Sequence, residues 1–242
     1  MHRFFVPDQG WEGDQIFLSG GEARQIDKVL RLRPGAVIEV LDGSGCAFLA
    51  RLEVVSSSRV QGRILGRKEV WTESPLQLTL GQALPRGSKM DFIVQKATEL
   101  GVSRIVPLWG ERTIGEGIGE QRLSRWQRIA KESAEQCGRL LIPTVESPRS
   151  LISFLAEERE GRGLLFWEGE RDLFLRQVLA EGRRDTHYVL LVGAEGGFSP
   201  QEVDMAKGRG FLSVSLGGRI LRCETVALVI LALLQYARGD LG

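Results

Sequence analysis

The sequence predicts a mixed α/β protein with two domains, a small N-terminal β-barrel and a larger C-terminal domain built on a parallel sheet. Three observations lead to this prediction. Short strand-like segments separated by turns fill residues 1–72, strand-like and helical segments alternate from Leu76 onward, and two glycine-rich turns follow strands near the C-terminus. Alternating strands and helices are typical of a parallel sheet that helices cover on both faces.

Composition is that of a globular protein. The chain has 242 residues, of which 43% are hydrophobic and 26% are charged, which is enough for two domains with cores of their own. The densest apolar run, residues 226–234, is too short to span a bilayer, and the N-terminus lacks the apolar region of a signal peptide. We therefore expect a cytoplasmic protein without a membrane segment.

Cysteines and histidines give no sign of a metal site. Cys46, Cys137 and Cys223 are far apart and form no C-x-x-C pair, which argues against a disulfide framework and a zinc site. His2 and His187 are the only histidines, and neither is placed as a convincing general base. The formal net charge is +1, so any RNA contact must come from a local basic patch.

Residues 1–72 are predicted to form the barrel. Strand-like stretches cover residues 15–18, 36–41, 46–54 and 59–65, and a helical stretch covers residues 22–30. The run Asp42-Gly43-Ser44-Gly45 has the composition of a tight turn that joins two strands into a hairpin. Residues 71–75 are predicted to be a linker, and residues 73–242 the second domain.

Strands and helices alternate in this second domain. Strands are predicted over residues 76–83, 104–108, 163–167, 188–192 and 211–216. Helices are predicted over residues 88–100, 122–137, 151–158 and 172–179, from Pro200 onward, and in a last segment that ends at Arg238. Ser88 is expected to cap its helix, and Ser199 with Glu202 has the spacing of a capping box.

Two glycine-rich turns follow the strands at residues 188–192 and 211–216. One runs from Gly193 to Gly197 and the other contains Gly217 and Gly218. Ligands bind at the carboxyl ends of strands in open α/β sheets, and glycines there allow the backbone to approach a ligand closely. Neither turn matches a phosphate-binding motif, whereas Ile220 and Leu221 offer the apolar contacts that an adenine ring needs.

V-G-A-E-G-G-F-S and S-L-G-G-R-I-L-R-C-E-T resemble the cofactor signature of the SPOUT methyltransferases, specifically the 16S ribosomal RNA uridine-N3 methyltransferase family. Residues 2–5, 28–35, 90–102, 125–130 and 135–139 resemble other segments of that family, in the same order along nearly the whole chain. Ala194, Cys223 and Val226 replace the family's usual proline, threonine and alanine, and residues 20–23 lack its paired histidines. The first three changes conserve size, so we expect the pocket to be kept.

The resemblance implies a trefoil-knotted domain in which loops that begin near Phe166, Gly193 and Leu216 wrap S-adenosylmethionine, next to a PUA-like barrel. The cofactor-binding residues that it implies are Phe166, Gly193, Glu195, Gly196, Gly197, Leu216, Gly217, Ile220, Leu221 and Thr225. It further implies methyl transfer to N3 of a specific uridine in 16S rRNA of the small ribosomal subunit, and a homodimer. The last helix is apolar on all sides over residues 226–234, which fits either a dimer interface or burial within one subunit.

Uracil N3 carries a proton at neutral pH, so its methylation needs a group that removes this proton or stabilises the resulting anion. Arg222 and Glu224, next to the second glycine turn, are the predicted catalytic residues. Arg222 would orient the base or stabilise its anion, and Glu224 would act as the base or hold Arg222. The alternative is a structural ion pair between the two. Glu195 has an alternative too, in which its carboxylate only binds neighbouring amides.

Basic residues on two helices and on the barrel are the predicted RNA contacts, although a charged helix face is often merely solvated. This set comprises Arg3, Arg31, Arg33, Lys89, Lys96, Arg125 and Arg139. Two other functions stay open at this point. One is a nucleotide-binding or dinucleotide-binding α/β enzyme, which the missing phosphate motif disfavours. The other is a non-catalytic RNA-binding or ribosome-assembly protein, which would bind RNA without transferring methyl groups.

Overall fold

The computed structural model describes residues 1–69, 72–113, 119–158, 160–181 and 185–242. It divides into two compact units: Met1–Glu73 with Ala134–Ile142, and Ser74–Ser133 with Pro143–Gly242. Trp71 of the predicted linker lies outside the described residues. No helix in the described part of the chain is long and apolar enough to cross a membrane.

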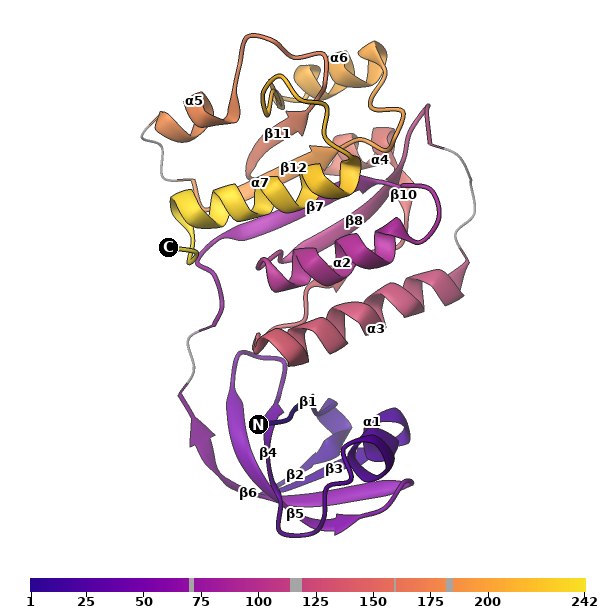
Figure 1. Ribbon diagram of the computed structural model, residues 1–242, viewed down its shortest axis with the longest axis vertical. Helices are drawn as coiled ribbons and strands as arrows, with labels where there is room; N and C mark the ends of the chain where they lie inside the picture. The colour runs from indigo at the N-terminus through magenta and orange to yellow at the C-terminus, as the bar shows by residue number, and fades with distance from the viewer. Residues whose placement is uncertain (70–71, 114–118, 159, 182–184) are drawn as a thin grey trace. The chain divides into compact units, whose positions relative to one another are not determined.

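A curled six-stranded sheet makes up most of the first unit (Figure 1). Its strands are β1 (Arg3–Phe5), β2 (Trp11–Glu12), β3 (Gln15–Ser19), β4 (Val37–Leu41), β5 (Ala47–Val55) and β6 (Arg59–Lys68), in the order β1-β4-β5-β6-β3-β2. All neighbours are antiparallel except β1 and β4. Phe4 near one edge and Ile16 near the other belong to one apolar cluster, so the sheet wraps around a single core, as the sequence predicted.

The predicted turn and helix of the barrel are both present. The Asp42 carboxylate accepts hydrogen bonds from the Ser44 amide at 2.9 Å and the Cys46 amide at 3.1 Å, which closes the hairpin between β4 and β5. The predicted helix is an α-helical turn, α1 (Gly20–Arg24), followed by a wider π-helical turn, η2 (Gln25–Val29). A short 3-10 turn, η1 (Asp8–Gly10), precedes β2.

Residues 134–142 complete the first unit although they come much later in the sequence. The Phe5 amide donates to Glu135 Oε1 at 2.9 Å. Phe5, Leu41 and Ala47 share an apolar cluster with residues of this segment, Ala134 and Leu140. Such a discontinuous unit cannot be described by a single boundary in the sequence.

The second unit is a parallel sheet with helices on both faces. Its strands are β7 (Gln77–Ala83), β8 (Arg104–Trp109), β9 (Thr144–Val145), β10 (Arg149–Ser150), β11 (Arg162–Phe166), β12 (His187–Val192) and β13 (Leu212–Val214). Their order is β10-β8-β7-β12-β11-β13, with β9 also paired to β8, and every pairing is parallel. The helices are α2 (Lys89–Glu99), α3 (Glu120–Cys137), α4 (Leu151–Glu157), α5 (Leu175–Ala180), α6 (Pro200–Gly208) and α7 (Cys223–Arg238).

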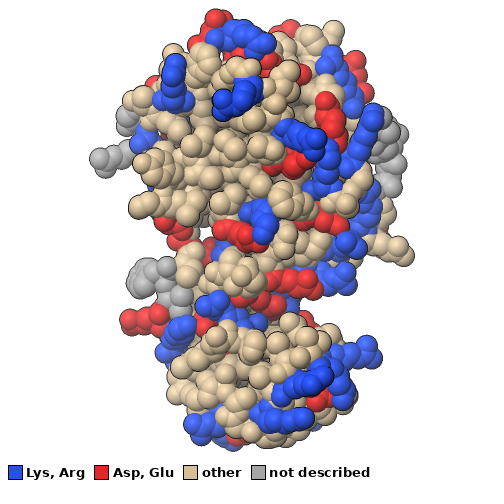
Figure 2. All heavy atoms as spheres, viewed as in Figure 1, with Lys and Arg blue, Asp and Glu red and all other residues tan. Residues whose placement is uncertain are grey.

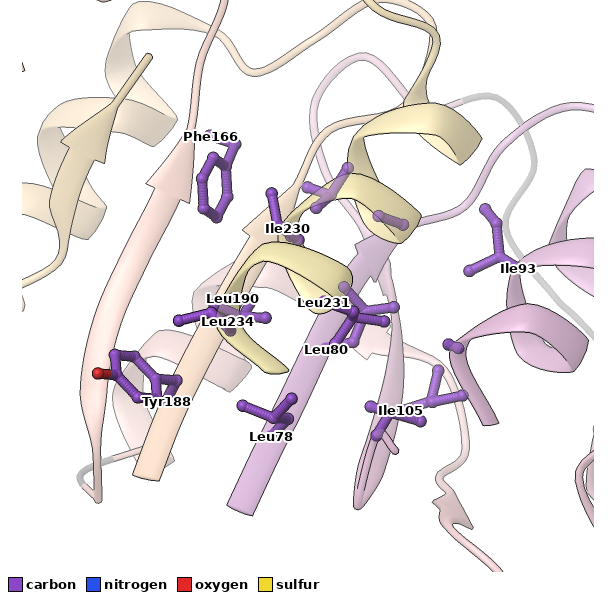
Figure 3. Packing of buried hydrophobic residues seen from close by; sticks show 14 of the residues in the cluster. Leu78, Leu80, Ile93, Ile105, Phe166, Tyr188, Leu190, Ile230, Leu231 and Leu234 are labelled. Atoms are coloured by element: carbon purple, nitrogen blue, oxygen red, sulfur yellow. The ribbon is translucent and has the colours of Figure 1, made fainter. Parts of the chain in front are cut away.

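Strand β12 shows how the two faces are built. Tyr188, Leu190 and Val192 point into the cluster under α2, α3, α5 and α7, whereas Val189 and Leu191 point into the cluster under α4 and α6. Successive side chains of a strand face opposite sides, so each strand supplies both layers. In Figure 3, Leu231 and Leu234 of α7 lie over Leu80 and Leu190 of the sheet.

One of the two predicted helix caps is present and the other is not. Ser199 Oγ accepts from the Glu202 amide and Glu202 Oε2 accepts from the Ser199 amide at 2.8 Å, which confirms the capping box. Ser88 makes no such hydrogen bond with its side chain, so its prediction as a capping side chain was wrong.

Candidate cofactor-binding and active site

Three neighbouring strands, β12, β11 and β13, end in one row. Phe166, at the end of β11, is in register with Val192 on one side and with Val214 on the other. Because the strands are parallel, the loops that follow them leave the sheet at the same edge. A pocket of about 500 Å³ lies there, within the usual size range of small-molecule sites.

Most of the predicted cofactor-binding residues line this pocket. They are Phe166, Gly193, Glu195, Gly196, Gly197, Leu216, Gly217, Ile220 and Leu221. Thr225, in the first turn of α7, is exposed and does not line it. The pocket therefore joins segments that are more than fifty residues apart in the sequence.

Glycines are required in the turn after β12. A Cβ atom at Gly193 would lie 3.0 Å from the Gly197 Cα. Gly197 has a φ of +65°, a left-handed conformation that other residues rarely adopt, and its amide donates to the Ala194 carbonyl at 3.0 Å. This close turn leaves its backbone along the pocket wall.

Lys89, the first residue of α2, enters the pocket and contacts two carboxylates. Its Nζ lies 2.7 Å from Glu195 Oε1 and 3.7 Å from Glu224 Oε2. The hydrogen bond to Glu195 raises the pKa of Lys89 above its ordinary value. Partial burial acts to raise the pKa of Glu195, but the hydrogen bonds from Lys89 and from backbone amides outweigh it and lower that pKa.

The predicted catalytic residues lie together at the start of α7. Arg222 is exposed, precedes the helix as its N-cap and lines the pocket. Glu224 accepts a hydrogen bond from the Cys223 thiol at 3.2 Å. Burial acts to raise the pKa of Glu224, but hydrogen bonds and the charges of Lys89 and Arg222 lower it overall. Within the described residues, the cation that makes an ion pair with Glu224 is Lys89, not Arg222.

The loop after β11 adds lining residues that the sequence analysis did not predict, namely Trp167, Glu168 and Arg171. The Glu168 carboxylate lies against Gly197, where a Cβ atom would collide with it. Glu170 braces this loop by accepting from the Arg171 and Asp172 amides. These residues follow Phe166, at the same edge of the sheet as the glycine turns, and that position in the sequence could have identified them.

Two predicted RNA contacts of the second unit, Lys96 and Arg125, make ion pairs with carboxylates. Lys96 Nζ lies 2.8 Å from Glu99 Oε1, and the Arg125 guanidinium lies 2.8 Å from Asp91 Oδ2. Arg125 is still half exposed, whereas Lys89 belongs to the pocket.

In the first unit, Arg31 and Arg33 are exposed, and Arg3 makes an ion pair with Glu39 at 3.3 Å. Arg139 is different, because it is only 7% exposed and binds Glu73 at 2.8 Å. Burial and an ion pair favour a structural role for Arg139, and its part in RNA binding stays a prediction.

A parallel α/β domain with a pocket at its strand ends, together with a curled antiparallel domain, matches the RNA methyltransferases that carry a PUA domain. The family model of an RNA methyltransferase domain matches residues 72–235, and that of an RNA methyltransferase PUA domain matches residues 12–65. The chain belongs to the family of ribosomal RNA small subunit methyltransferase E, as its relatives show.

The Synechocystis sp. protein of that name is 35% identical over 219 residues, which cover 90% of this chain and 71% of the relative. The Bacillus subtilis protein is 27% identical and covers 99% of this chain and 100% of its own. The crystal structure of the Neisseria gonorrhoeae protein bound to S-adenosyl methionine is 36% identical, with a TM-score of 0.92 and complete coverage of both chains. A Legionella pneumophila methyltransferase in complex with the same cofactor is 34% identical, with a TM-score of 0.88 and 98% coverage of each chain.

Proposed function

We propose that this protein transfers a methyl group from S-adenosylmethionine to N3 of a specific uridine in 16S rRNA of the small ribosomal subunit. The observation that carries the proposal is the pocket at the ends of β11, β12 and β13, with its two glycine turns. The relatives bound to the cofactor support it, because their fold covers this chain from end to end.

The residues of the pocket fit this cofactor. Leu216, Ile220 and Leu221 provide an apolar wall for a flat ring, and the glycine turns expose backbone groups that can bond its polar edge. Glu168 and Glu195 offer carboxylates to hydroxyl or ammonium groups. When bound, the cofactor supplies an activated methyl group on a positively charged sulfur.

Arg222 is the residue that we assign to the uracil. Its guanidinium is exposed at the pocket wall and can orient the base or bind its anion. The lowered pKa of Glu224 makes its carboxylate a weak proton acceptor, so we assign it to positioning the cations around it.

We assign RNA binding to the PUA-like barrel of residues 1–72 and methyl transfer to the SPOUT domain of residues 73–242, with the three pocket loops forming the trefoil knot. Basic and acidic side chains are interspersed on the visible face of each part in Figure 2. Recognition of a folded RNA shape therefore suits this surface better than binding through net charge. We place the protein in the cytoplasm, with no metal ion in its reaction.

We further propose that two copies associate through helix α7. Residues 226–234 of this helix are apolar on all sides, yet Leu233 is 40% exposed, and Tyr236 one turn later is 74% exposed. Apolar groups of this size in one helix are typical of an interface with another chain. The alternative is that the helix serves only the core of one subunit, and these two exposed side chains support the dimer.

The decisive experiment uses small ribosomal subunits from cells that lack this gene. They are incubated with the purified protein and labelled S-adenosylmethionine, and reverse-transcriptase stops on the RNA are mapped. Methylation at N3 blocks the Watson–Crick edge, so we expect label together with one new stop at a uridine.

Other results would change the proposal in defined ways. Label without a stop would keep the methyltransferase and reject N3. Neither label nor binding of S-adenosylhomocysteine would favour a non-catalytic RNA-binding protein, and tight binding of NAD or ATP instead would favour a nucleotide-binding enzyme.

A further inference from the structure

Two cations from different elements meet at the wall of the pocket. Lys89 is the first residue of α2, and Arg222 directly precedes α7. Both line the pocket, and both lie near Glu224, since Lys89 Nζ is 3.7 Å from Glu224 Oε2 and the charge of Arg222 contributes to the lowered pKa of that carboxyl. Each residue stands at the N-terminal end of its helix, where the helix dipole adds positive potential.

The carboxylates beside these cations are already engaged. Glu195 accepts from Lys89 Nζ at 2.7 Å and from the Arg86 amide at 3.3 Å, and Glu224 accepts from the Cys223 thiol. Both carboxyls have lowered pKa values, although partial burial acts in the opposite direction. Neither is therefore suited to take a proton from a weakly acidic N–H group.

Lys89 keeps one donor for a substrate. An ammonium group has three N–H donors, and Glu195 and Glu224 account for two directions. The side chain lines the pocket and is 35% exposed, so a bound substrate can reach its ammonium group. The other charged groups that line this pocket are Glu168, Arg171 and Arg219, and the buried Cys223 thiol stays neutral.

We propose that Lys89, together with Arg222, stabilises the negative charge that the uracil ring carries after N3 has lost its proton. The proposal rests on the proposed function. It differs from the sequence prediction for Lys89, which was an RNA contact outside the chemical step. Besides lining the cofactor pocket, Glu195 then has a positioning role, because its other contact fixes the lysine.

The methyl transfer needs no protein side chain as a base. The N3–H bond breaks and its proton passes to water, which leaves an anion whose charge is shared with the ring oxygens. The N3 electron pair then bonds to the methyl carbon while the carbon–sulfur bond breaks, and sulfur keeps that electron pair. The products are the N3-methylated uridine, S-adenosylhomocysteine and one proton.

The test is the pH profile of kcat for Lys89→Gln and Lys89→Arg, measured with saturating S-adenosylmethionine and small ribosomal subunits. A nearby cation typically lowers the pKa of an acid by about one unit or more, so loss of Lys89 should shift the rise of kcat to higher pH by about one unit. At pH 7 we expect about a tenfold loss for Lys89→Gln, because below the pKa of the uracil kcat falls in proportion to the fraction of anion. Lys89→Arg should restore part of the rate.

Arg209→Gln is the matched control, since it removes one exposed positive charge at the end of α6, outside the pocket. Binding of S-adenosylhomocysteine to Lys89→Gln should change by less than about threefold, which reports an intact pocket. A uniform loss of kcat at every pH would overturn the proposal in favour of a structural role. A raised KM for the subunit with normal kcat would overturn it in favour of the RNA contact. Absence of methyl transfer by the unmodified protein would instead refute the proposed function.

Discussion

Arg222 is the residue that we assign to the uracil. Its side chain is exposed at the pocket wall and makes no capping hydrogen bond to the backbone of α7. We predict that Arg222→Ala lowers kcat by about a hundredfold, because a preorganised charge is lost where the substrate becomes negative. The melting temperature and the affinity for S-adenosylhomocysteine should stay within error. Full activity in this variant would show that Arg222 has no part in catalysis.

Gly197 combines a left-handed backbone with a close neighbour. An alanine there would adopt an unfavourable φ of +65° and displace the Glu168 carboxylate. We predict that Gly197→Ala costs about 1 kcal/mol of stability and weakens S-adenosylhomocysteine binding about tenfold in calorimetry. Gly210→Ala is the control, because its φ is +88° but it has open space around it and does not line the pocket. Equal loss of affinity in both variants would contradict the prediction.

The Cys223 thiol makes the stability and the reactivity of the protein depend on pH. Burial, with the adjacent Glu224 carboxylate, raises its pKa from 9.0 to about 12. The thiolate is therefore disfavoured in the folded state, and stability present below pH 9 is lost as pH rises towards 12. We predict that iodoacetamide at pH 9 modifies Cys223 at least about a hundredfold more slowly in the folded protein than in urea, as followed by peptide mass mapping.

Residue type and spacing identified the glycine turns because their requirement is local. Gly193 to Gly197 is one closed turn, and its sequence alone indicates a close approach of backbone. Lys89 and Glu195 are 106 residues apart, and nothing local indicates that they meet. Glu168 was missed for the same reason, since its neighbour Gly197 belongs to another loop.

Long elements were predicted well, whereas several of the shortest ones were missed. The strand predicted over residues 76–83 is β7 (Gln77–Ala83), and the helix predicted over residues 88–100 is α2 (Lys89–Glu99). Strands β9 and β10 have two residues each, and β1 has three, too few for any periodicity to appear. Strand β1 exists because it pairs with β4, more than thirty residues later.

Glu202 links two elements through one carboxylate. Its Oε2 accepts from the Ser199 amide at the start of α6, and its Oε1 accepts from the Glu111 amide beyond β8, both at 2.8 Å. The residue is buried, so its loss leaves two amides without a partner. We predict that Glu202→Ala lowers the free energy of unfolding by about 2 kcal/mol in urea titrations. Glu202→Gln keeps one acceptor oxygen and should lose about half as much; an unchanged midpoint in both would contradict this account.

At the scale of the whole molecule, alternation of strands and helices was enough to predict the parallel sheet and its two helical layers. The order of the strands was not predicted, because it depends on contacts between distant segments. Strands β11 and β13 are neighbours although β12 lies between them in the sequence, and this crossing is what brings three loops to one pocket.

The proposed dimer makes a prediction for the intact molecule. Light scattering should give twice the chain mass of 26.8 kDa for the unmodified protein. Leu233→Arg places a charge on the exposed face of α7 and should yield a monomer, because an unpaired charge is costly in an apolar interface. Ile152→Arg, at a 64% exposed apolar residue of α4, should leave the mass unchanged. A dimer in both variants would place the interface elsewhere.

The segment Ala134–Ile142 also sets an order of events during synthesis. Phe5, Leu41 and Ala47 are translated early, but Ala134 and Leu140, which share their cluster, emerge only after residues 74–133 have been made. The first unit therefore cannot be completed by residues 1–73 alone, and a nascent chain released at residue 73 lacks the partners of Glu73 and Phe5. The N-terminal unit reaches its complete form only after Ala134–Ile142 has left the ribosome, by which time residues 74–133 of the second unit have been made.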